Sequence, residues 1–432
     1  MLKSNISDST NGANLIIERN IKLKILKPTA YYFPENVASS HLSNDLEIEL
    51  FNENIEIKII TPMPTRGISE EIRKIYKKNK IESKADGKIE IIRFNLFREK
   101  KCVIFRAIRY LISILKQYQI GKRQKDIDLI FAESTPPIQG VLGVWLKKKL
   151  NVPFVYVVQD VFPDSLLNTR IIKRKGIIWF IGRTIENYIY KNADKIIVIS
   201  NDFKNNLLDK NVPNDKLTVI NNWIDTEIVR HIEKDDNKLF DKYKISRDKF
   251  IVSYCGNLGM TQNLEMVIEA AEKLRNFEDI LFVFVGEGSN KGKLVDLSMR
   301  QQLTNIIFIP FQPYADISQV FSLADVGLVV SKPNVGSNSV PSKAFTILAA
   351  SQPILASFDV ESELCKVITD HNCGFCVDPN DIEQFLAKLL KMYKERITTR
   401  RMGQNGRDLM ESMYSKNINT RKYIDLFISL MS

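Results

Sequence analysis

The sequence predicts an α/β protein of two doubly wound domains that face a cleft, and three observations support this prediction. At 432 residues, the chain is longer than one ordinary domain. Short runs rich in Val and Ile alternate with longer helix-like segments, which is the pattern of a parallel sheet covered on both faces. The alternation stops once, in the charged segment 230–250, and then starts again.

This interruption divides the chain into two domains. We expect an N-terminal domain at 21–229 and a C-terminal domain at 230–406. A polar extension at 1–20 precedes them, and a final segment at 407–432 is expected to form a helix that packs back on the N-terminal domain.

The strands are expected where short β-branched runs occur. Those of the first domain are residues 21–30, 55–64, 89–94, 128–134, 154–160, 195–200 and 216–222, and those of the second are 251–257, 280–288, 306–311, 326–331 and 353–358. Residues 140–150 and 180–193 are helix-like, and 264–276 places apolar residues at helical spacing. Ligands of such folds bind outside the carboxyl ends of the strands, so loops from both domains should line the cleft.

Composition limits the classes of function. Hydrophobic residues make up 44% of the chain and charged residues 26%, as in a globular protein with real cores. The formal charge of +11 favours polyanions or anionic lipid as partners, although a lysine-rich composition alone would give the same charge. Nucleic acid is a poor candidate, because the basic charge is spread and no aromatic-basic platform stands out.

Cysteine and histidine usage argues against a metal centre and against a disulfide framework. The five cysteines, Cys102, Cys255, Cys365, Cys373 and Cys376, are few and scattered. Cys373 and Cys376 have redox or zinc spacing, but no second pair accompanies them and the chain has only three histidines. We therefore expect no metal and no cofactor.

No targeting or membrane-spanning segment is expected. The chain contains no run of roughly 18 or more apolar residues, which a membrane helix needs. The polar N-terminal segment has no apolar signal-peptide core. We expect a cytoplasmic protein.

The loops that follow the strands of the second domain are small and polar. They are residues 256–263, 286–292, 310–315 and 332–343. The first precedes a helix, so its backbone N–H groups and the helix dipole could hold a phosphate. Its Gly-x-x-Gly pattern lacks the spacing of a dinucleotide site, and a tight turn is an equal alternative.

The last of these loops leads into a helix start that carries Lys343, after Pro341 and Ser342. A lysine in the first turn opposes the helix dipole, so a bound anion explains it better than helix stability does. Two helix starts and this lysine together would suit a diphosphate. The alternative is a solvated lysine.

Several segments in a fixed order carry a resemblance to a known family. They are residues 134–140, 152–165, 193–200, 219–225, 256–265, 285–288 and 340–357. Together they resemble the retaining glycosyltransferases of family 4, which have the GT-B fold of two Rossmann-like domains. The chain is particularly similar to the bacterial subgroup of capsule, O-antigen and exopolysaccharide enzymes, including fucosamine-type and colanic-acid transferases.

The resemblance implies a nucleotide-sugar donor, expected to be UDP-linked, in the C-terminal domain. It implies a lipid-diphosphate-linked saccharide acceptor in the N-terminal domain, and transfer of a hexosyl or N-acetylhexosaminyl group with retention at the anomeric carbon. Enzymes of this fold generally use no metal, because helix N-termini and basic side chains stabilise the leaving diphosphate.

The resemblance assigns the donor site residue by residue. Asn257 and Gln262 stand where family members usually carry arginine and lysine, and Asn338 and Thr346 stand where many carry glutamates. Asn338 can still accept a bond from a sugar hydroxyl, whereas Thr346 would contact the ribose only weakly. Lys343 then carries much of the positive charge, and we expect it and Asn338 to be catalytic. The implied donor-binding residues are Gly256, Asn257, Leu258, Gly259, Gln262, Gly286, Glu287, Phe311, Ser339, Val340, Pro341, Ser342 and Thr346.

On the acceptor side, Asp160 ends a strand and is expected to orient the acceptor or to take its proton. A carboxylate with its usual pKa of about 4 is a weak base at neutral pH unless burial raises that pKa. The alternative is that Asp160 caps the following turn. The other acceptor-side residues are expected to be Asn36, Ser39, Ser40, Ser134, Thr135, Gln159, Pro163 and Asp164, of which the first three replace the paired glycines of the family's first loop. For the turn that contains Ser134 and Thr135, a purely structural role is an equal alternative.

Lys and Arg surround an apolar helix in segment 97–125, where Val103, Ile104, Ile108, Leu111, Ile112 and Leu115 recur at helical spacing. A basic amphipathic helix is typical of an interfacial anchor, so we expect peripheral binding to the anionic inner face of the cell membrane. The alternative is a helix that covers its own sheet.

Two other functions stay open. A nucleotide-sugar epimerase or hydrolase also uses paired α/β domains, although the order of the motifs favours transfer. A non-catalytic partner that binds a nucleotide sugar or another transferase would tolerate the replacements at Asn338 and Thr346. Product analysis with donor and lipid acceptor separates these functions.

Overall fold

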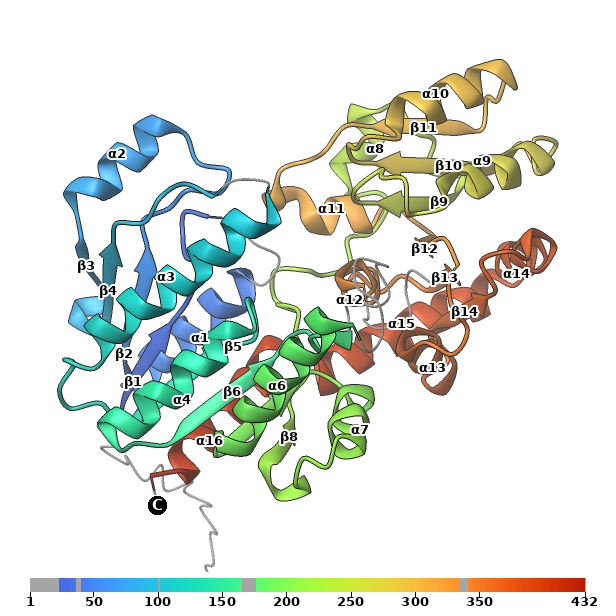
Figure 1. Ribbon diagram of the computed structural model, residues 1–432. Helices are drawn as coiled ribbons and strands as arrows, with labels where there is room; N and C mark the ends of the chain where they lie inside the picture. Colours follow the sequence, from blue (N-terminus) through green and yellow to red (C-terminus); the bar gives the residue numbers. More distant parts are fainter. Residues whose placement is uncertain (1–22, 36–39, 100–101, 165–175, 334–340, 432) are drawn as a thin grey trace, which may run out of the picture.

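The structure, a computed structural model, describes residues 23–35, 40–99, 102–164, 176–333 and 341–431. Figure 1 shows two α/β lobes, one from each half of the chain. Each lobe contains its own largely parallel sheet with helices on both faces, so the predicted fold class is confirmed.

The N-terminal domain has an eight-stranded sheet in the order β3-β4-β2-β1-β5-β6-β7-β8 within the described residues. Only β3 is antiparallel to its neighbour. The strand order reverses between β1 and β5, which is the switch point of this sheet. The strands are β1 (Lys24–Pro28), β2 (Glu56–Pro62), β3 (Ile81–Lys84), β4 (Ile89–Phe94), β5 (Leu129–Glu133), β6 (Phe154–Val158), β7 (Lys195–Val198) and β8 (Leu217–Val219).

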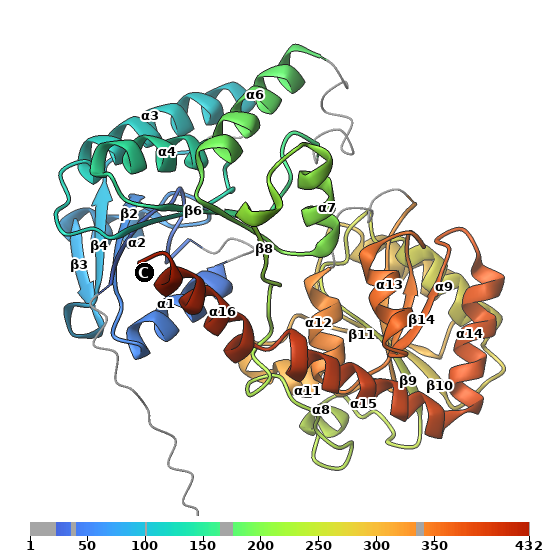
Figure 2. The ribbon, with the colours of Figure 1, turned by 90° about the horizontal axis from the view of Figure 1, so that it is seen from below.

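Helices cover both faces of this sheet because successive strand side chains point to opposite sides. Leu26 and Ile60 face one helical layer, α3 (Val103–Gly121), α4 (Ile138–Leu150) and α6 (Ile177–Asn192). Ile25 and Ile57 face the other, α1 (Ser40–Asn52) and α16 (Lys416–Ser429). Figure 2 shows the two layers on opposite sides of the strands. The domain is completed by α2 (Glu70–Lys78), α7 (Asn201–Asp209) and the short turns η1 (Ala85–Gly87) and η2 (Asn214–Lys216).

The C-terminal domain has an all-parallel sheet in the order β11-β10-β9-β12-β13-β14, whose switch point lies between β9 and β12. The strands are β9 (Phe250–Cys255), β10 (Ile280–Val285), β11 (Ile306–Ile309), β12 (Val326–Val330), β13 (Ile354–Ser357) and β14 (Gly374–Val377). One face is covered by α9 (Leu264–Lys273), α10 (Lys291–Arg300) and α14 (Ile382–Lys394). The other is covered by α8 (Lys238–Lys242), η3 (Tyr314–Asp316), α11 (Ile317–Phe321), α12 (Ser342–Ala349), α13 (Glu363–Asp370) and α15 (Arg396–Met413).

The chain passes between the domains twice, and the two crossings are paired. Ile224, after β8, forms a parallel bridge with Ser415, which lies between α15 and α16. Lys416 Nζ also contacts Asp225 Oδ2 at 2.7 Å. Trp223 Nε1 donates to Asp45 Oδ2 on α1 at 3.0 Å. The second crossing delivers α16 to the N-terminal sheet.

β3 and β14 were not predicted from the sequence. Both are four-residue edge strands, and neither carries the β-branched run from which the other strands were predicted. Pairing with β4 and β13 holds them in place. Cys376 on β14 is joined to Cys365 by a disulfide with a Cα–Cα distance of 5.5 Å, whereas Cys373 is free and buried. Cys373 and Cys376 therefore do not form a disulfide with each other, despite their redox-like spacing.

Candidate functional site

The carboxyl edge of the second sheet, at the switch point between β9 and β12, gathers the loops predicted to bind an anion. The loop 256–263 follows β9 and leads into α9, and α12 follows β12. A switch point is where open α/β sheets bind their ligands, because the two loops leave in opposite directions.

Backbone hydrogen bonds join the loops after β9 and β10. The Gly256 N–H donates to the Val285 carbonyl at 2.9 Å, and the Leu258 N–H donates to the Glu287 carbonyl at 2.8 Å. Gly286 has a φ of +146°, and a Cβ there would lie 2.0 Å from the Gly256 carbonyl oxygen. Only glycine fits this close approach, so the second loop acts as a rigid support for the first.

Two amide side chains of the predicted donor site converge on Gly259. A Cβ on this glycine would lie 2.7 Å from both Asn257 Nδ2 and Gln262 Oε1. Gln262 Oε1 is buried and has no hydrogen-bond partner in the part of the chain that the structure describes. A buried unpaired oxygen is costly until a donor reaches it, so this oxygen marks a position for a ligand donor.

Two helices begin at this edge without a side-chain cap. Neither Asn263 before α9 nor Pro341 before α12 makes a capping hydrogen bond. Among the described residues, the amide N–H groups of Asn257 and Gly259 also donate to no backbone carbonyl. Uncapped helix starts and free loop amides are the donors that bind phosphate groups.

Lys343, in the first turn of α12, reaches across the switch point to β9. Its Nζ donates to Tyr254 Oη at 2.7 Å and lies 4.1 Å from the centroid of the Tyr254 ring. Tyr254 Oη in turn donates to the Asn257 carbonyl at 2.9 Å. This chain of contacts connects α12 to the loop 256–263. Tyr254 was not predicted, although a tyrosine one residue before the end of β9 is a visible signal.

The Lys343 ammonium group has no carboxylate partner within the described residues. Burial lowers its pKa from 10.5 to about 8, and the nearby Cys255 thiol opposes this shift. Burial also raises the pKa of Tyr254, so this phenol does not supply a negative charge at neutral pH. A bound anion would supply the missing negative charge and restore the charged form of the lysine.

The other predicted donor-site residues occupy varied positions. The carboxylate of Glu287 pairs with Lys291 Nζ at 2.7 Å. Phe311, after β11, is 72% exposed and is therefore available for stacking. Thr346 is buried, and its hydroxyl donates to the Ser342 carbonyl one turn earlier at 3.4 Å, while Ser342 itself is exposed. Asn338, Ser339 and Val340 lie outside the described residues.

Ser134 organises the carboxyl edge of the first sheet, where the acceptor was predicted. Its buried Oγ accepts from the amide N–H groups of Gln159 at 2.9 Å and Asp160 at 3.2 Å. Gln159 Oε1 accepts from Asn222 Nδ2 at 3.0 Å. Ser134 and Gln159 thus fix the ends of β5 and β6, and they present Asp160 exposed at the end of β6.

Asp164 lies in an ion-pair cluster. Its carboxylate is 2.8 Å from Lys210 Nζ and 3.4 Å from Arg183 Nη2, and both cations also pair with the buried Glu186. The cluster gives Asp164 a structural explanation, and its predicted contact with the acceptor stays a prediction.

The remaining acceptor-side residues are dispersed. Thr135 is exposed after β5, Pro163 is buried after β6, and Ser40 is the half-buried first residue of α1. Asn36 and Ser39 lie outside the described residues.

A buried ion-pair cluster occupies the switch point of the first sheet, and the sequence analysis missed it. Lys27 on β1 is 2% exposed, and its Nζ lies 3.0 Å from Glu47 and 3.6 Å from Glu133, at the end of β5. Ser43 Oγ accepts from the same Nζ at 2.8 Å. Burial alone would lower the pKa of Lys27, but the two carboxylates outweigh burial and raise it. A lysine inside an otherwise apolar strand was the available signal.

The carboxyl edges of the two sheets meet. Lys366 on α13 lies 3.6 Å from Asp202 on α7, and these helices follow β13 and β7 respectively. The predicted donor and acceptor edges therefore border the same interdomain region.

The helix predicted as an interfacial anchor is α3, and its two faces differ. Its inner face buries Ile114 and Ser113 against the domain, while Ile104, Ile108, Leu111 and Leu115 are 44–70% exposed. In the described part of the chain, no helix has the length and apolarity needed to cross a membrane. The same residues contain no group of three or more His, Cys, Asp or Glu side chains placed to hold a metal.

Two family patterns match the chain and divide it as the structure does. Residues 45–228 match the pattern described as Glycosyltransferase Family 4, and residues 235–409 match the one described as Glycosyl transferases group 1. The boundary between the matches lies in the first interdomain crossing.

Relatives of the chain carry glycosyltransferase names. The Probable glycosyltransferase WbjE of Pseudomonas aeruginosa is 25% identical over 76% of this chain and 80% of its own length. The Putative colanic acid biosynthesis glycosyl transferase WcaI of Escherichia coli is 28% identical over 57% of this chain and 61% of its own. The structure of Anabaena HepE in complex with UDP superposes with a TM-score of 0.69 at 14% identity, covering 95% of this chain and all (100%) of that one, which shows a common fold.

Proposed function

Because the chain belongs to the family 4 glycosyltransferases with the GT-B fold, of the capsule and colanic-acid type, we propose a specific transfer reaction for it. A hexosyl or N-acetylhexosaminyl group moves from a UDP-sugar to a lipid-linked saccharide precursor, with retention at the anomeric carbon. The reaction takes place at the inner face of the cell membrane, to which the protein binds peripherally.

Lys343 is the observation that carries this proposal. Its ammonium group lies at the switch point of the C-terminal sheet, bonded only to neutral Tyr254 among the described residues. Two uncapped helix starts and the loop 256–263 surround the same edge. Diphosphate matches this set of donors, because it offers several acceptor oxygens and two negative charges to amides and one cation.

In the proposed reaction, the bond between the anomeric carbon and the β-phosphate oxygen breaks, and a bond to the acceptor hydroxyl oxygen forms. The electron pair of the broken bond stays on the diphosphate, so negative charge develops next to Lys343. A preorganised cation at that position stabilises the transition state more than the ground state. Asp160, exposed at the opposite edge, is our candidate for orienting the acceptor or taking its proton.

The choice of UDP is supported by the chemistry of the site and by one structural relative. HepE, which shares the fold, binds UDP. Phe311, the exposed aromatic residue at the end of β11, offers a face on which a uracil base can stack. The proposal assigns the neutralisation of the diphosphate to Lys343 and the helix amides, so transfer should continue in EDTA.

Thermal unfolding with UDP tests the donor site. A ligand present at 100 times its dissociation constant stabilises the folded state by about 2.7 kcal/mol, so UDP should raise the melting temperature of the wild type measurably. Lys343→Ala should lose this shift. Lys238→Ala provides a matched control, because Lys238 is an exposed lysine at the start of α8 and lies outside the site. An equal UDP shift in both variants would remove Lys343 from the donor site.

Product analysis tests the reaction itself. UDP-sugars that shift the melting temperature are incubated with a short-chain prenyl-diphosphate saccharide, and the new linkage is assigned by NMR. Retention is supported if the new glycosidic bond has the same anomeric configuration, axial or equatorial, as the sugar–phosphate bond of the donor. Binding of UDP-sugars without transfer or hydrolysis would favour the non-catalytic alternative.

A further inference from the structure

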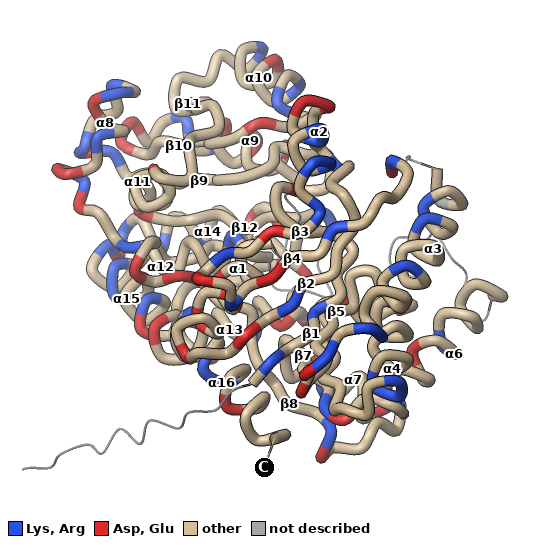
Figure 3. Tube along the Cα trace, turned by 90° about the vertical axis from the view of Figure 1, so that its left-hand side faces the viewer, with Lys and Arg blue, Asp and Glu red and all other residues tan. Residues whose placement is uncertain are grey.

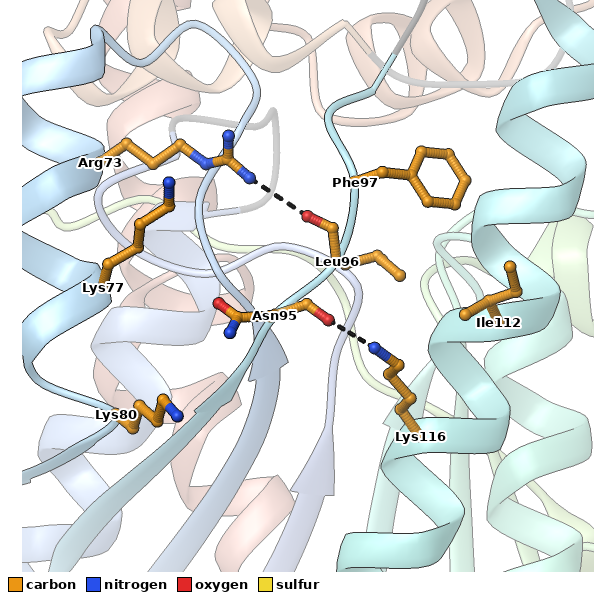
Figure 4. Close-up of a pocket in the computed structure, with 8 residues that line it drawn as sticks. All are labelled: Arg73, Lys77, Lys80, Asn95, Leu96, Phe97, Ile112 and Lys116. Atoms are coloured by element: carbon orange, nitrogen blue, oxygen red, sulfur yellow. Dashed lines mark hydrogen bonds between the residues drawn. The ribbon is translucent and has the colours of Figure 1, made fainter.

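The N-terminal domain contains a surface cavity of about 870 Å³ between α2 and α3, outside the residues assigned so far. Its floor is the segment Asn95–Phe97, directly after β4. Since β4 runs parallel to β2 and, through it, to β1, this floor lies at the same carboxyl edge as the predicted acceptor residues. Figure 4 shows side chains from both helices pointing toward this segment.

Four cations and no carboxylate line this cavity. Arg73 and Lys77 come from one face of α2, Lys80 follows that helix, and Lys116 lies on α3. Arg73 is paired with Glu70, but the three lysines make no ion pair within the described residues. Like charges that converge on one hollow repel each other, so a bound polyanion would stabilise this arrangement. Elsewhere along the chain, Figure 3 shows basic and acidic residues interspersed in the view that it draws.

Two of the cations are held in place and two are available. Arg73 donates through Nη2 to the Leu96 carbonyl at 3.2 Å, and its Nη1 lies 3.8 Å from the Glu70 carboxylate. Its side chain is 11% exposed, and its buried Nε has no hydrogen-bond partner in the described residues. Lys116 donates to the Asn95 carbonyl at 2.8 Å. Lys77 and Lys80 make no ion pair with any described carboxylate. A fixed guanidinium and two ammonium groups without ion-pair partners in the described residues are suited to phosphate oxygens.

The apolar part of the cavity lining continues along α3. Leu96, Phe97 and Ile112 lie among the lining residues. Beyond them, the outer face of α3 exposes Ile108 by 44% and Leu111 by 50%. Cations next to a continuous apolar strip match an amphiphile whose charged head enters the cavity and whose hydrocarbon chain follows the helix.

A second helix of the same layer also exposes apolar side chains. α6 lies on the same side of the sheet as α3, with α4 packed between the two helices (Figure 2). Its first turn exposes Ile177 by 80%, Ile178 by 60% and Ile181 by 56%. The sequence predicts only α3 as a basic amphipathic helix, whereas the fold places two exposed apolar helix faces on the same side of the domain.

We infer that the cavity between α2 and α3 binds the diphosphate of the lipid-linked acceptor, with the prenyl chain lying along the exposed face of α3. This inference rests on the proposed function, because it names where that acceptor is held. The diphosphate is recognised by Arg73, Lys77, Lys80 and Lys116.

The test measures binding of farnesyl diphosphate to the full chain by calorimetry, beside inorganic pyrophosphate and farnesol. The double variant Lys77→Gln/Lys80→Gln should bind farnesyl diphosphate more weakly, by about tenfold for each lost charge-assisted contact. Lys74→Gln/Lys78→Gln is the matched control, since it removes the same charge from exposed positions of α2 that do not line the cavity. Farnesyl diphosphate should also bind more tightly than pyrophosphate or farnesol alone.

Four outcomes would overturn the inference. They are absence of farnesyl diphosphate binding, equal binding of pyrophosphate, equal loss in both double variants, and binding of phosphatidylglycerol vesicles through Lys77 and Lys80 without binding of farnesyl diphosphate. The melting-temperature shift by UDP is measured on the same samples. A normal UDP shift with failed farnesyl diphosphate binding rejects only the cavity assignment, whereas a missing UDP shift in the wild type rejects the donor proposal instead.

Discussion

Each of the two sheets has a buried or largely buried lysine that connects the two strands at its switch point, but the partners of these lysines differ. Lys27 connects β1 to Glu133 at the end of β5 and also pairs with Glu47. Lys343, after β12, contacts the hydroxyl and ring of Tyr254 on β9 and has no carboxylate partner among the described residues. The carboxylates raise the pKa of Lys27 against the effect of burial, whereas burial lowers the pKa of Lys343 to about 8.

This difference separates a structural lysine from a ligand-binding one. The negative charge that Lys27 requires is part of the protein, so its contacts contribute to the folded state. The charge that Lys343 requires is missing from the described residues, so its burial is a cost that a bound anion can offset. A site with an uncompensated charge is less stable than it could be, and this is common at functional positions.

The largest expected effect is on the stability of the N-terminal domain. Lys27→Met leaves Glu47 and Glu133 without their cation, and removal of one partner from a buried ion pair costs about 3–5 kcal/mol. Urea unfolding of the variant should show this loss. While it is folded, the variant should still show the rise in melting temperature caused by UDP, because Lys27 belongs to the other domain. Little change in stability would contradict the structural role of Lys27.

The next effect is on catalysis. Lys343→Met keeps an unbranched side chain of nearly the same length and removes its charge, so the developing charge on the diphosphate loses its nearest cation. Removal of one such group lowers kcat by about 10²–10³-fold, and we expect a loss of this size in the transfer rate. Single-turnover measurements at saturating donor separate it from weaker binding. A variant that keeps more than half of the wild-type rate would place the charge stabilisation elsewhere.

A third effect concerns the pH dependence of the affinity for a UDP-sugar. The pKa of Lys343 is about 8 in the free protein, and a bound diphosphate raises it. Binding above pH 8 therefore takes up a proton, so the affinity for a UDP-sugar should be constant near pH 7 and fall as pH rises above 8, by at most about tenfold per pH unit. Lys343→Met should bind weakly at every pH. An unchanged affinity of the wild type up to pH 10 would show that Lys343 does not contact the ligand.

The smallest effect is on the stability of the ligand-free protein. The folded-state pKa of Lys343 lies below its usual value of 10.5, so the unfolded chain binds more protons between about pH 8 and 10.5. This group therefore destabilises the fold at neutral pH, and its cost decreases as pH rises through that window. Lys343→Met should be more stable than the wild type at pH 7, on the order of 1 kcal/mol, in the absence of ligand. A destabilised Lys343→Met would assign the lysine a structural role like that of Lys27.

Much of the fold follows from local patterns in the sequence. Buried parallel strands need continuous runs such as those of β6 and β10, which are visible without any contact information. The edge strands β3 and β14 were missed because pairing with a neighbour, rather than their own composition, holds them. Lys343 was found because a lysine in a first helical turn conflicts with the helix dipole.

The candidate site was predicted only in outline. The sequence indicated Asn257, Gln262 and Lys343, but not that the two amides meet at Gly259 or that Lys343 bonds to Tyr254, 89 residues earlier. On the acceptor edge, Ser134 proved to be bonded to two backbone amides. Such pairings depend on strand order, which a single sequence does not specify.

Local sequence is enough to show which loops are small, which strands are buried and where a helix start carries an unexpected cation, because these features depend on neighbouring residues. Tertiary structure decided which charges are compensated. Lys27 obtained its carboxylates from α1 and β5, and Lys343 obtained none from the described residues, because only the order of strands in each sheet brings distant side chains together at a switch point.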